Sequence, residues 1–170
     1  MTAQFTSYTY VEPLLRERGV TEENVSIVLL GYGFAGVMGL LTVLRLSDRS
    51  PSAAFRFAVG LVALSIVGVL LSRESAVWTA VFVLIWGLTF GALPLLVQVL
   101  GLRGAGALPS AGAPVNNASF NVGIAAGSAI GGVLLALTNL TVLLVSSSVL
   151  MLAIFATTLI PRWLPSDRAH

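Results

Sequence analysis

The stretch that decides the fold is Asn116-Asn117-Ala118-Ser119-Phe120-Asn121-Val122-Gly123-Ile124-Ala125-Ala126-Gly127-Ser128-Ala129-Ile130-Gly131-Gly132. It lies within an apolar run long enough to cross a bilayer as a helix, which takes about 20 residues. On such a helix two stripes run along the stretch: one of glycines, Gly123, Gly127 and Gly131, and one of polar residues, Asn117, Asn121 and Ser128. The glycine stripe predicts close packing against a neighbouring helix. The polar stripe predicts a buried polar cavity, because amides that face lipid are costly.

The composition indicates a membrane protein. The 170 residues are 56% hydrophobic and 9% charged, with a mean hydropathy of +0.96, whereas about a quarter of the residues in soluble domains are charged. The chain has no cysteine, and its one histidine is the last residue, His170. We therefore expect no cofactor and no metal site, and we find no catalytic motif that would indicate an enzyme.

Five segments have the length and apolarity of full membrane spans. They cover residues 25–46, 52–71, 76–102, 115–137 and 140–163. Residues 2–15 are apolar and aromatic but reach only about two-thirds of a span, and we interpret them as the outer end of a helix whose beginning is missing. The predicted fold class is an all-α integral membrane bundle, in which residues 1–170 form one transmembrane domain of five full helices plus a partial one.

Arginine predicts the orientation of this bundle. The chain has nine arginines and no lysine, spread between the hydrophobic segments, which argues against a nucleic-acid surface. If the loop with Arg45 and Arg49 is cytoplasmic, six arginines and two acids lie inside (+4) and three arginines and five acids outside (−2). The positive-inside rule then predicts a multi-pass protein of the cell membrane with a cytoplasmic C-terminus.

A weak internal repeat points to transport. Phe5 precedes Pro13-Leu14-Leu15, and Phe90 precedes Pro94-Leu95-Leu96. A glycine-rich span and then a plain apolar span follow each of these segments. Repeats of three helices with opposite topology are typical of secondary transporters.

Four stretches together resemble a known family. They are residues 8–15 (Tyr-Thr-Tyr-Val-Glu-Pro-Leu-Leu), residues 33–49 with Arg45-Leu46-Ser47-Asp48-Arg49 at the end, residues 86–94 (Trp-Gly-Leu-Thr-Phe-Gly-Ala-Leu-Pro) with Gln98, and the opening stretch. In this order they resemble helices seven, eight, ten and eleven of a major facilitator superfamily transporter, in the bacterial drug and sugar efflux branch of drug:proton antiporters. One departure is Leu44, where that branch usually has a glycine.

The resemblance implies the C-terminal half of a transporter, with helices 7–12 of the major facilitator fold. Its partners would be the lipid bilayer, a small-molecule substrate, protons and a missing N-terminal six-helix half. The function expected is half of a proton-coupled efflux carrier for small amphipathic molecules, drugs or sugars. The alternatives are a non-transporting truncated remnant and one chain of a two-chain carrier.

The candidates for a substrate cavity are Tyr8, Tyr10, Glu12, Tyr32, Gln98, Asn117 and Asn121. The tyrosines could instead form an interfacial aromatic belt, and Gln98 could bond another helix. Glu12 shares a predicted helical face with Phe5 and Tyr8. It could bind a cation or a proton, or it could reach the surface about one turn from Arg16.

Two further groups of residues have predicted roles. Arg45, Asp48 and Arg49 form either a cytoplasmic gate or a topology signal. The glycines expected to pack helices together are Gly36, Gly39, Gly87, Gly91, Gly123, Gly127 and Gly131. The plain segments 52–71 and 140–163 are expected to face lipid, and the glycine-rich segments are expected to face the cavity.

Overall fold

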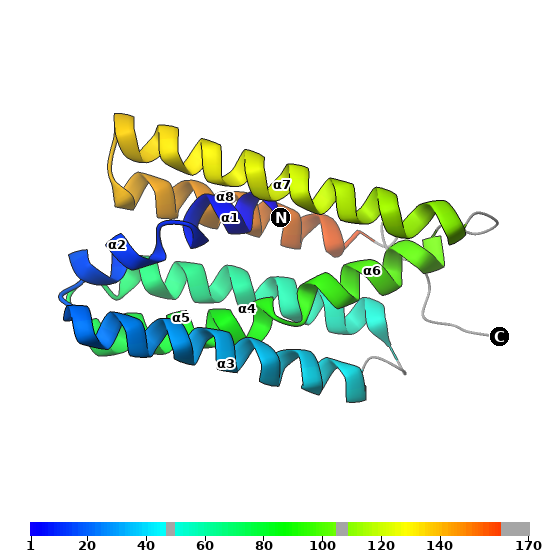
Figure 1. Ribbon diagram of the computed structural model, residues 1–170, viewed down its shortest axis with the longest axis horizontal. Coiled ribbons are helices and arrows are strands. Elements are labelled where there is room, and N and C mark those ends of the chain that lie inside the picture. The colour runs from blue at the N-terminus through cyan, green and yellow to red at the C-terminus, as the bar shows by residue number, and fades with distance from the viewer. Residues whose placement is uncertain (47–49, 105–108, 161–170) are drawn as a thin grey trace.

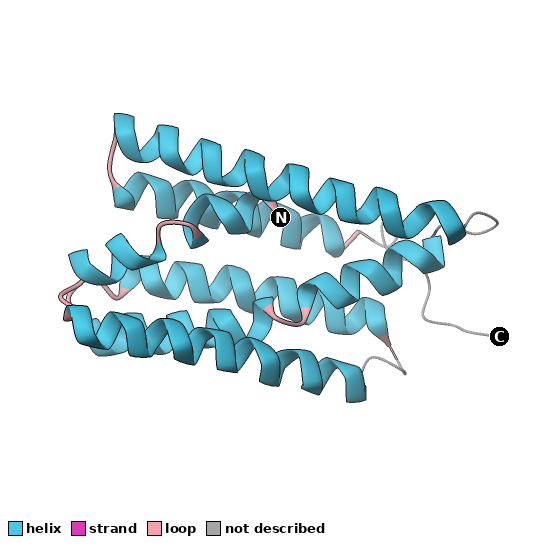
Figure 2. Ribbon diagram, in the orientation of Figure 1, coloured by secondary structure: helices cyan, strands magenta, loops and turns pink. Residues whose placement is uncertain are grey.

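The computed structural model describes residues 1–46, 50–104 and 109–160, which form helices joined by short turns and contain no strand (Figure 2). The helices are α1 (Thr2–Tyr8), α2 (Val11–Glu17), α3 (Glu22–Leu46), α4 (Pro51–Leu71), α5 (Ala76–Phe90), α6 (Leu93–Gly104), α7 (Pro109–Leu137) and α8 (Leu140–Thr158). Among the described residues, five spans are long and apolar enough to cross a membrane, and α5 and α6 together form one of them. The all-α membrane fold with five full spans is therefore confirmed.

Two proline residues interrupt segments that the sequence analysis treated as single helices. Residues 2–15 divide between α1 and α2 at Thr9 and Tyr10, and the span Ala76–Leu102 divides between α5 and α6. Proline has no N–H to donate four residues back, and its ring crowds the carbonyl there. The residue four before Pro13 is Thr9, in the first break, and the residue four before Pro94 is Phe90, the last residue of α5. As a result, Phe5, Tyr8 and Glu12 do not share one continuous helical face, and that prediction is wrong.

The helices pack as a bundle in which each span has specific neighbours (Figure 1). The α5 helix lies between α3 and α4, α4 also packs against α8, and α1 packs against α7 and α8. The α1 helix begins at mid-length of the bundle and leads through α2 to the end where α3 starts. A tight turn joins α2 to α3 at Gly19, whose φ of 79° favours glycine.

Glycines bring α3 and α5 into backbone contact. A Cβ atom at Gly39 would overlap the Leu88 carbonyl, and one at Gly91 would overlap the backbone of Gly36. A Cβ at Gly87 would lie 2.5 Å from the Tyr32 carbonyl oxygen. No other residue type fits so close an approach without moving the helices apart.

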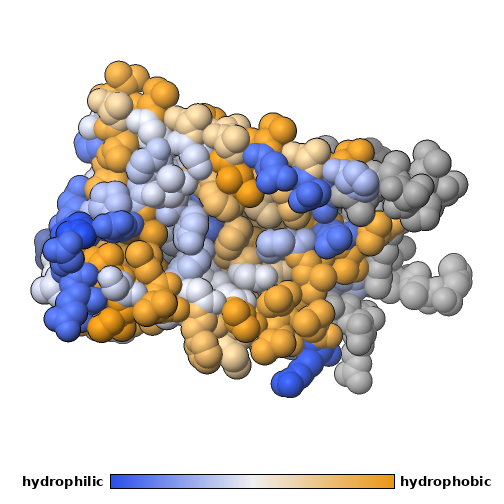
Figure 3. All heavy atoms as spheres, viewed as in Figure 1, coloured by the Kyte–Doolittle hydropathy of each residue, from blue (hydrophilic) through white to orange (hydrophobic). Residues whose placement is uncertain are grey.

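Many large apolar side chains are exposed on the bundle, as a bilayer requires, and the face in Figure 3 shows broad apolar areas interspersed with more polar ones. Phe34 on α3 is 70% exposed, Leu64 on α4 is 61% exposed, and Val122 on α7 is 69% exposed. Hydrophilic residues gather at the end where α2 meets α3. Within this chain α4 is the most buried of the five spans, and the glycine-rich α3 and α7 are the least buried. One face of α4 packs inward, and only its other face is free for lipid.

Candidate functional site

A buried amide at the centre of the bundle joins three helices. Gln4 on α1 is 1% exposed. Its Nε2 donates to the Tyr32 hydroxyl on α3 at 3.3 Å, and its Oε1 accepts from Trp86 Nε1 on α5 at 2.7 Å. A side-chain amide at membrane depth is costly unless both its NH2 group and its carbonyl oxygen form hydrogen bonds. The pair of bonds therefore fixes α1 against α3 and α5.

Aromatic rings surround this amide. The Tyr8 ring stacks on Tyr32 with centroids 5.0 Å apart, and it meets Trp86 edge-on at 6.4 Å. Phe5 meets Phe90 edge-on with centroids 6.0 Å apart. Tyr32 is buried, 7% exposed, so it lies inside the bundle and not in an interfacial belt. Tyr8 is partly buried beside it.

The polar stripe of α7 contacts the break between α1 and α2. The Tyr10 hydroxyl donates to the Ser128 carbonyl at 2.9 Å, and the hydroxyls of Thr9 and Ser128 are 2.9 Å apart. The glycine stripe of α7 lies against α1. A Cβ at Gly127 would lie 2.5 Å from the Thr2 carbonyl, and one at Gly123 would lie 2.8 Å from Met1 Cβ. At Gly131 a Cβ would overlap the carbonyl of Thr6.

A second group of amides lines a recess between α6 and α7, which we call the amide recess. It has a volume of about 270 Å³ and is lined by Pro94, Leu95, Gln98, Asn116, Asn117 and Phe120. The structure thus places Gln98 beside Asn117, two residues that the sequence analysis chose on separate grounds. Asn121 lies one turn along α7, exposed, and its Nδ2 donates to the Asn117 carbonyl at 3.0 Å. The side chains of the recess combine hydrogen-bond donors and acceptors with an aromatic ring and carry no charge.

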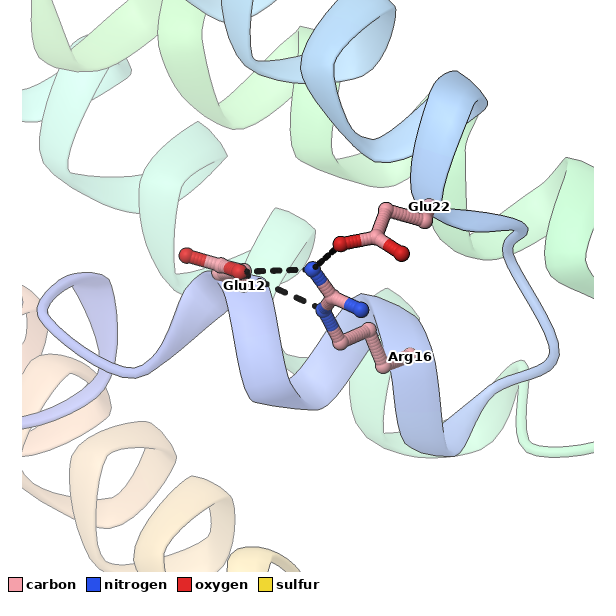
Figure 4. A network of polar contacts seen from close by, with 3 residues as sticks. All are labelled: Glu12, Arg16 and Glu22. Atoms are coloured by element: carbon pink, nitrogen blue, oxygen red, sulfur yellow. Dashed lines mark hydrogen bonds and ion pairs between the residues drawn. The ribbon is translucent and has the colours of Figure 1, made fainter.

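Glu12 lies apart from both groups, in an exposed ion-pair network (Figure 4). Arg16 Nη2 is 3.1 Å from Glu12 Oε1 and 2.9 Å from Glu22 Oε1, so it joins α2 to the start of α3. Hydrogen bonds to Glu22 and Glu12 raise the pKa of the Arg16 guanidinium above its ordinary value. The placement agrees with the surface alternative for Glu12.

Most of the residues predicted for the cytoplasmic gate lie outside the described part of the chain. Arg45 is exposed in the last turn of α3. Asp48 and Arg49 lie outside the described residues. The gate therefore stays a prediction.

Comparison with known proteins finds similarity to two curated proteins that share one name. The chain is 30% identical over 132 residues to a "Probable sugar efflux transporter" of Haemophilus influenzae strain PittGG, and equally to the protein of that name in strain 86-028NP. Each match covers 77% of this chain but 33% of the relative, so the chain spans about a third of the length of the curated relatives it matches. No family profile matches the chain. The chain is therefore similar to a part of proteins named for sugar efflux, and its described residues include five candidate membrane spans.

Three of the residues that build these groups are not among the candidates predicted from the sequence. Gln4 stands alone in a segment treated as a truncated helix, although a lone amide among apolar residues is itself a signal. Trp86 contributed to the resemblance but was not selected. Asn116 lines the amide recess, but on a helical projection it lies outside the stripe of Asn117 and Asn121 that the sequence indicated.

Proposed function

We propose that this chain is the C-terminal six-helix half of a proton-coupled efflux carrier of the major facilitator superfamily, and that its substrates are small neutral polar molecules such as sugars. The broad function rests on the similarity to "Probable sugar efflux transporter" proteins over 77% of the chain. The observation that carries the substrate class is the amide recess, where Gln98, Asn116 and Asn117 converge from two helices.

The chemistry of the recess favours a sugar over a cationic drug. Each amide side chain offers both a donor and an acceptor, which matches hydroxyl groups. The Phe120 ring supplies an apolar face for the C–H side of a sugar ring. Among the described residues no charged side chain lines the recess, so a cation would have no counter-charge there.

A second six-helix unit would complete the carrier. The α3 and α7 helices are the least buried spans and would meet that unit. A helical segment preceding α1 would run along a recess of about 320 Å³ beside Gln4, between α4, α6, α7 and α8. Residues 25–46, 52–71, 76–102, 115–137 and 140–163 contain no aspartate, glutamate or histidine. The group that binds and releases protons would therefore belong to the other half, since Glu12 is exposed and paired.

The test is export of a radiolabelled sugar from cells that make residues 1–170 alone, or together with the N-terminal six helices of a Haemophilus influenzae relative. We expect membrane insertion without export from the chain alone. Export that stops with a proton uncoupler is expected only when both halves are present. In the complete carrier, Asn116→Ala should reduce sugar export several-fold, whereas Ala125→Ser on the exposed face of α7 should not.

The alternatives give different results in the same cells. A non-transporting remnant would leave export absent with every N-terminal half tried. One chain of a two-chain carrier would be active with a separately encoded half and would co-purify with it. Uncoupler-sensitive export from residues 1–170 alone would refute the half-carrier proposal and indicate a homodimer, in which Glu12→Gln should then abolish export.

A further inference from the structure

An apolar groove runs along the outside of the bundle between α4 and α8. Its volume is about 650 Å³, and its lining includes Gly60, Leu64 and Val67 from α4 and Leu152, Phe155 and Leu159 from α8. Gly60 lets the Phe155 ring lie close to the α4 backbone, because a Cβ there would lie 2.8 Å from that ring. Leu64 is 61% and Leu159 is 59% exposed, so the walls of the groove project from the bundle.

Arg56 lies at one end of this groove and is its one charged lining residue. Its Nε is buried and, among the described residues, has no hydrogen-bond partner. Arg56 lies five residues, about 7.5 Å, inside the start of α4. A guanidinium at this depth is costly unless an anion or water meets it. Its remaining donors suit the oxygens of a phosphate group.

The length of the groove matches one leaflet of a bilayer. Arg56 and Val67 are eleven residues apart on α4, which corresponds to about 16 Å along a helix. The hydrocarbon core of a bilayer is about 30 Å thick, so one leaflet contributes about half of that. An acyl chain lying along the groove would therefore carry its headgroup to the level of Arg56.

We propose that this groove binds a phospholipid with an anionic headgroup, its phosphate on Arg56 and one acyl chain against Gly60, Leu64 and Phe155. The site is separate from the amide recess, which lies between α6 and α7. A second copy of the chain in the same membrane orientation fits less well. A two-fold contact through this groove would bring two Arg56 side chains of like charge to the same depth.

The experiment measures lipid retention on the full chain in detergent by native mass spectrometry. The probes are phosphatidylglycerol and phosphatidylcholine, each titrated separately, with inorganic phosphate as a competitor. We compare the wild type with Arg56→Gln, Arg56→Lys and Gly60→Leu. Arg73→Gln is the matched control, since it removes the same charge from an exposed position beyond the other end of α4. Size-exclusion profiles report the fold and the oligomeric state of every variant.

We expect the wild type, Arg56→Lys and Arg73→Gln to retain phosphatidylglycerol in preference to phosphatidylcholine. Arg56→Gln should weaken that retention at least about fivefold, in line with the contribution of one basic residue to binding of an anionic lipid. Gly60→Leu should weaken retention of both lipids, because its side chain would push the Phe155 ring out of place and change the lining of the groove. Inorganic phosphate should not compete, because the acyl chain supplies part of the binding.

Three results would overturn the proposal. Equal retention by Arg56→Gln and Arg73→Gln would show that Arg56 does not hold the headgroup. Displacement of the lipid by inorganic phosphate would indicate a simple anion site. A wild-type dimer that Gly60→Leu converts to a monomer, with lipid retention unchanged, would show that a second copy occupies the groove. None of these results depends on transport, so the proposed function can fail while this inference holds.

Discussion

The backbone contact between α3 and α5 makes a prediction with a matched control in the same helix. Gly39 is buried, and a Cβ there would overlap the Leu88 carbonyl of α5. Gly33 is exposed on α3, and a Cβ there would have nothing within 4 Å. Alanine gains up to about 1 kcal/mol over glycine within a helix at either position. The difference between Gly39→Ala and Gly33→Ala therefore isolates the cost of overpacking.

The cost of overpacking at Gly39 depends on which atom the added Cβ would meet. A flexible side chain can rotate, but the Leu88 carbonyl belongs to the helix backbone, so α3 and α5 must separate. Overpacking of this kind costs about 1–3 kcal/mol. For a chain of this size each kcal/mol changes the melting temperature by about 2–4 °C. Gly39→Ala should therefore melt about 2–12 °C below Gly33→Ala.

The assay is thermal unfolding of both purified variants in one detergent, followed by tryptophan fluorescence. Trp86 on α5 is fully buried and hydrogen-bonded to Gln4, so its emission reports separation of the helices that meet there. We expect Gly33→Ala to melt at or slightly above the wild-type temperature. A melting temperature for Gly39→Ala equal to or above that of Gly33→Ala would refute the close packing of α3 on α5.

Three further predictions concern other parts of the bundle. Gly127→Leu should lower the free energy of unfolding by about 1–3 kcal/mol, because its side chain would enter the contact of α7 with Thr2 and Phe5. Ala125→Leu, on the exposed face of α7, should be near neutral. Equal melting temperatures for the two variants would contradict this. Arg16→Gln should leave the melting temperature unchanged within error, since exposed ion pairs contribute little. A cytoplasm-specific reporter after His170 should be active, and one between residues 18 and 24 should be silent; the reverse pattern would invert the topology.

The sequence predicted the spans well because hydrophobic length alone determines them. Helix length and apolarity placed five spans correctly. The close approaches at Gly39, Gly91 and Gly127 involve glycines that the sequence analysis named as candidates for helix packing. These features depend on local sequence, so one chain without a structure is enough to find them.

Features that depend on partners far apart in the chain were harder to predict. Whether Pro13 and Pro94 end a helix or merely bend it depends on the neighbours that take over the freed backbone groups. Gln4 acquires its role from Tyr32 and Trp86, which lie 28 and 82 residues away. Gly60 also has a partner that is far away in the chain. It lies on a helix expected to face lipid, yet it contacts Phe155 of α8.

The break between α5 and α6 lies between the buried group around Gln4 and the amide recess. The α5 helix packs against α3 and α4, whereas α6 packs against α4 and α7. A single span thus changes its neighbour from α3 to α7 on passing Gly91 and Ala92. Before the break, Trp86 bonds Gln4 in the buried centre. After the break, Gln98 reaches the asparagines of α7. Pro94 cannot continue the hydrogen bonding of α5, and it also lines the amide recess, so the break and the recess meet at the same residue.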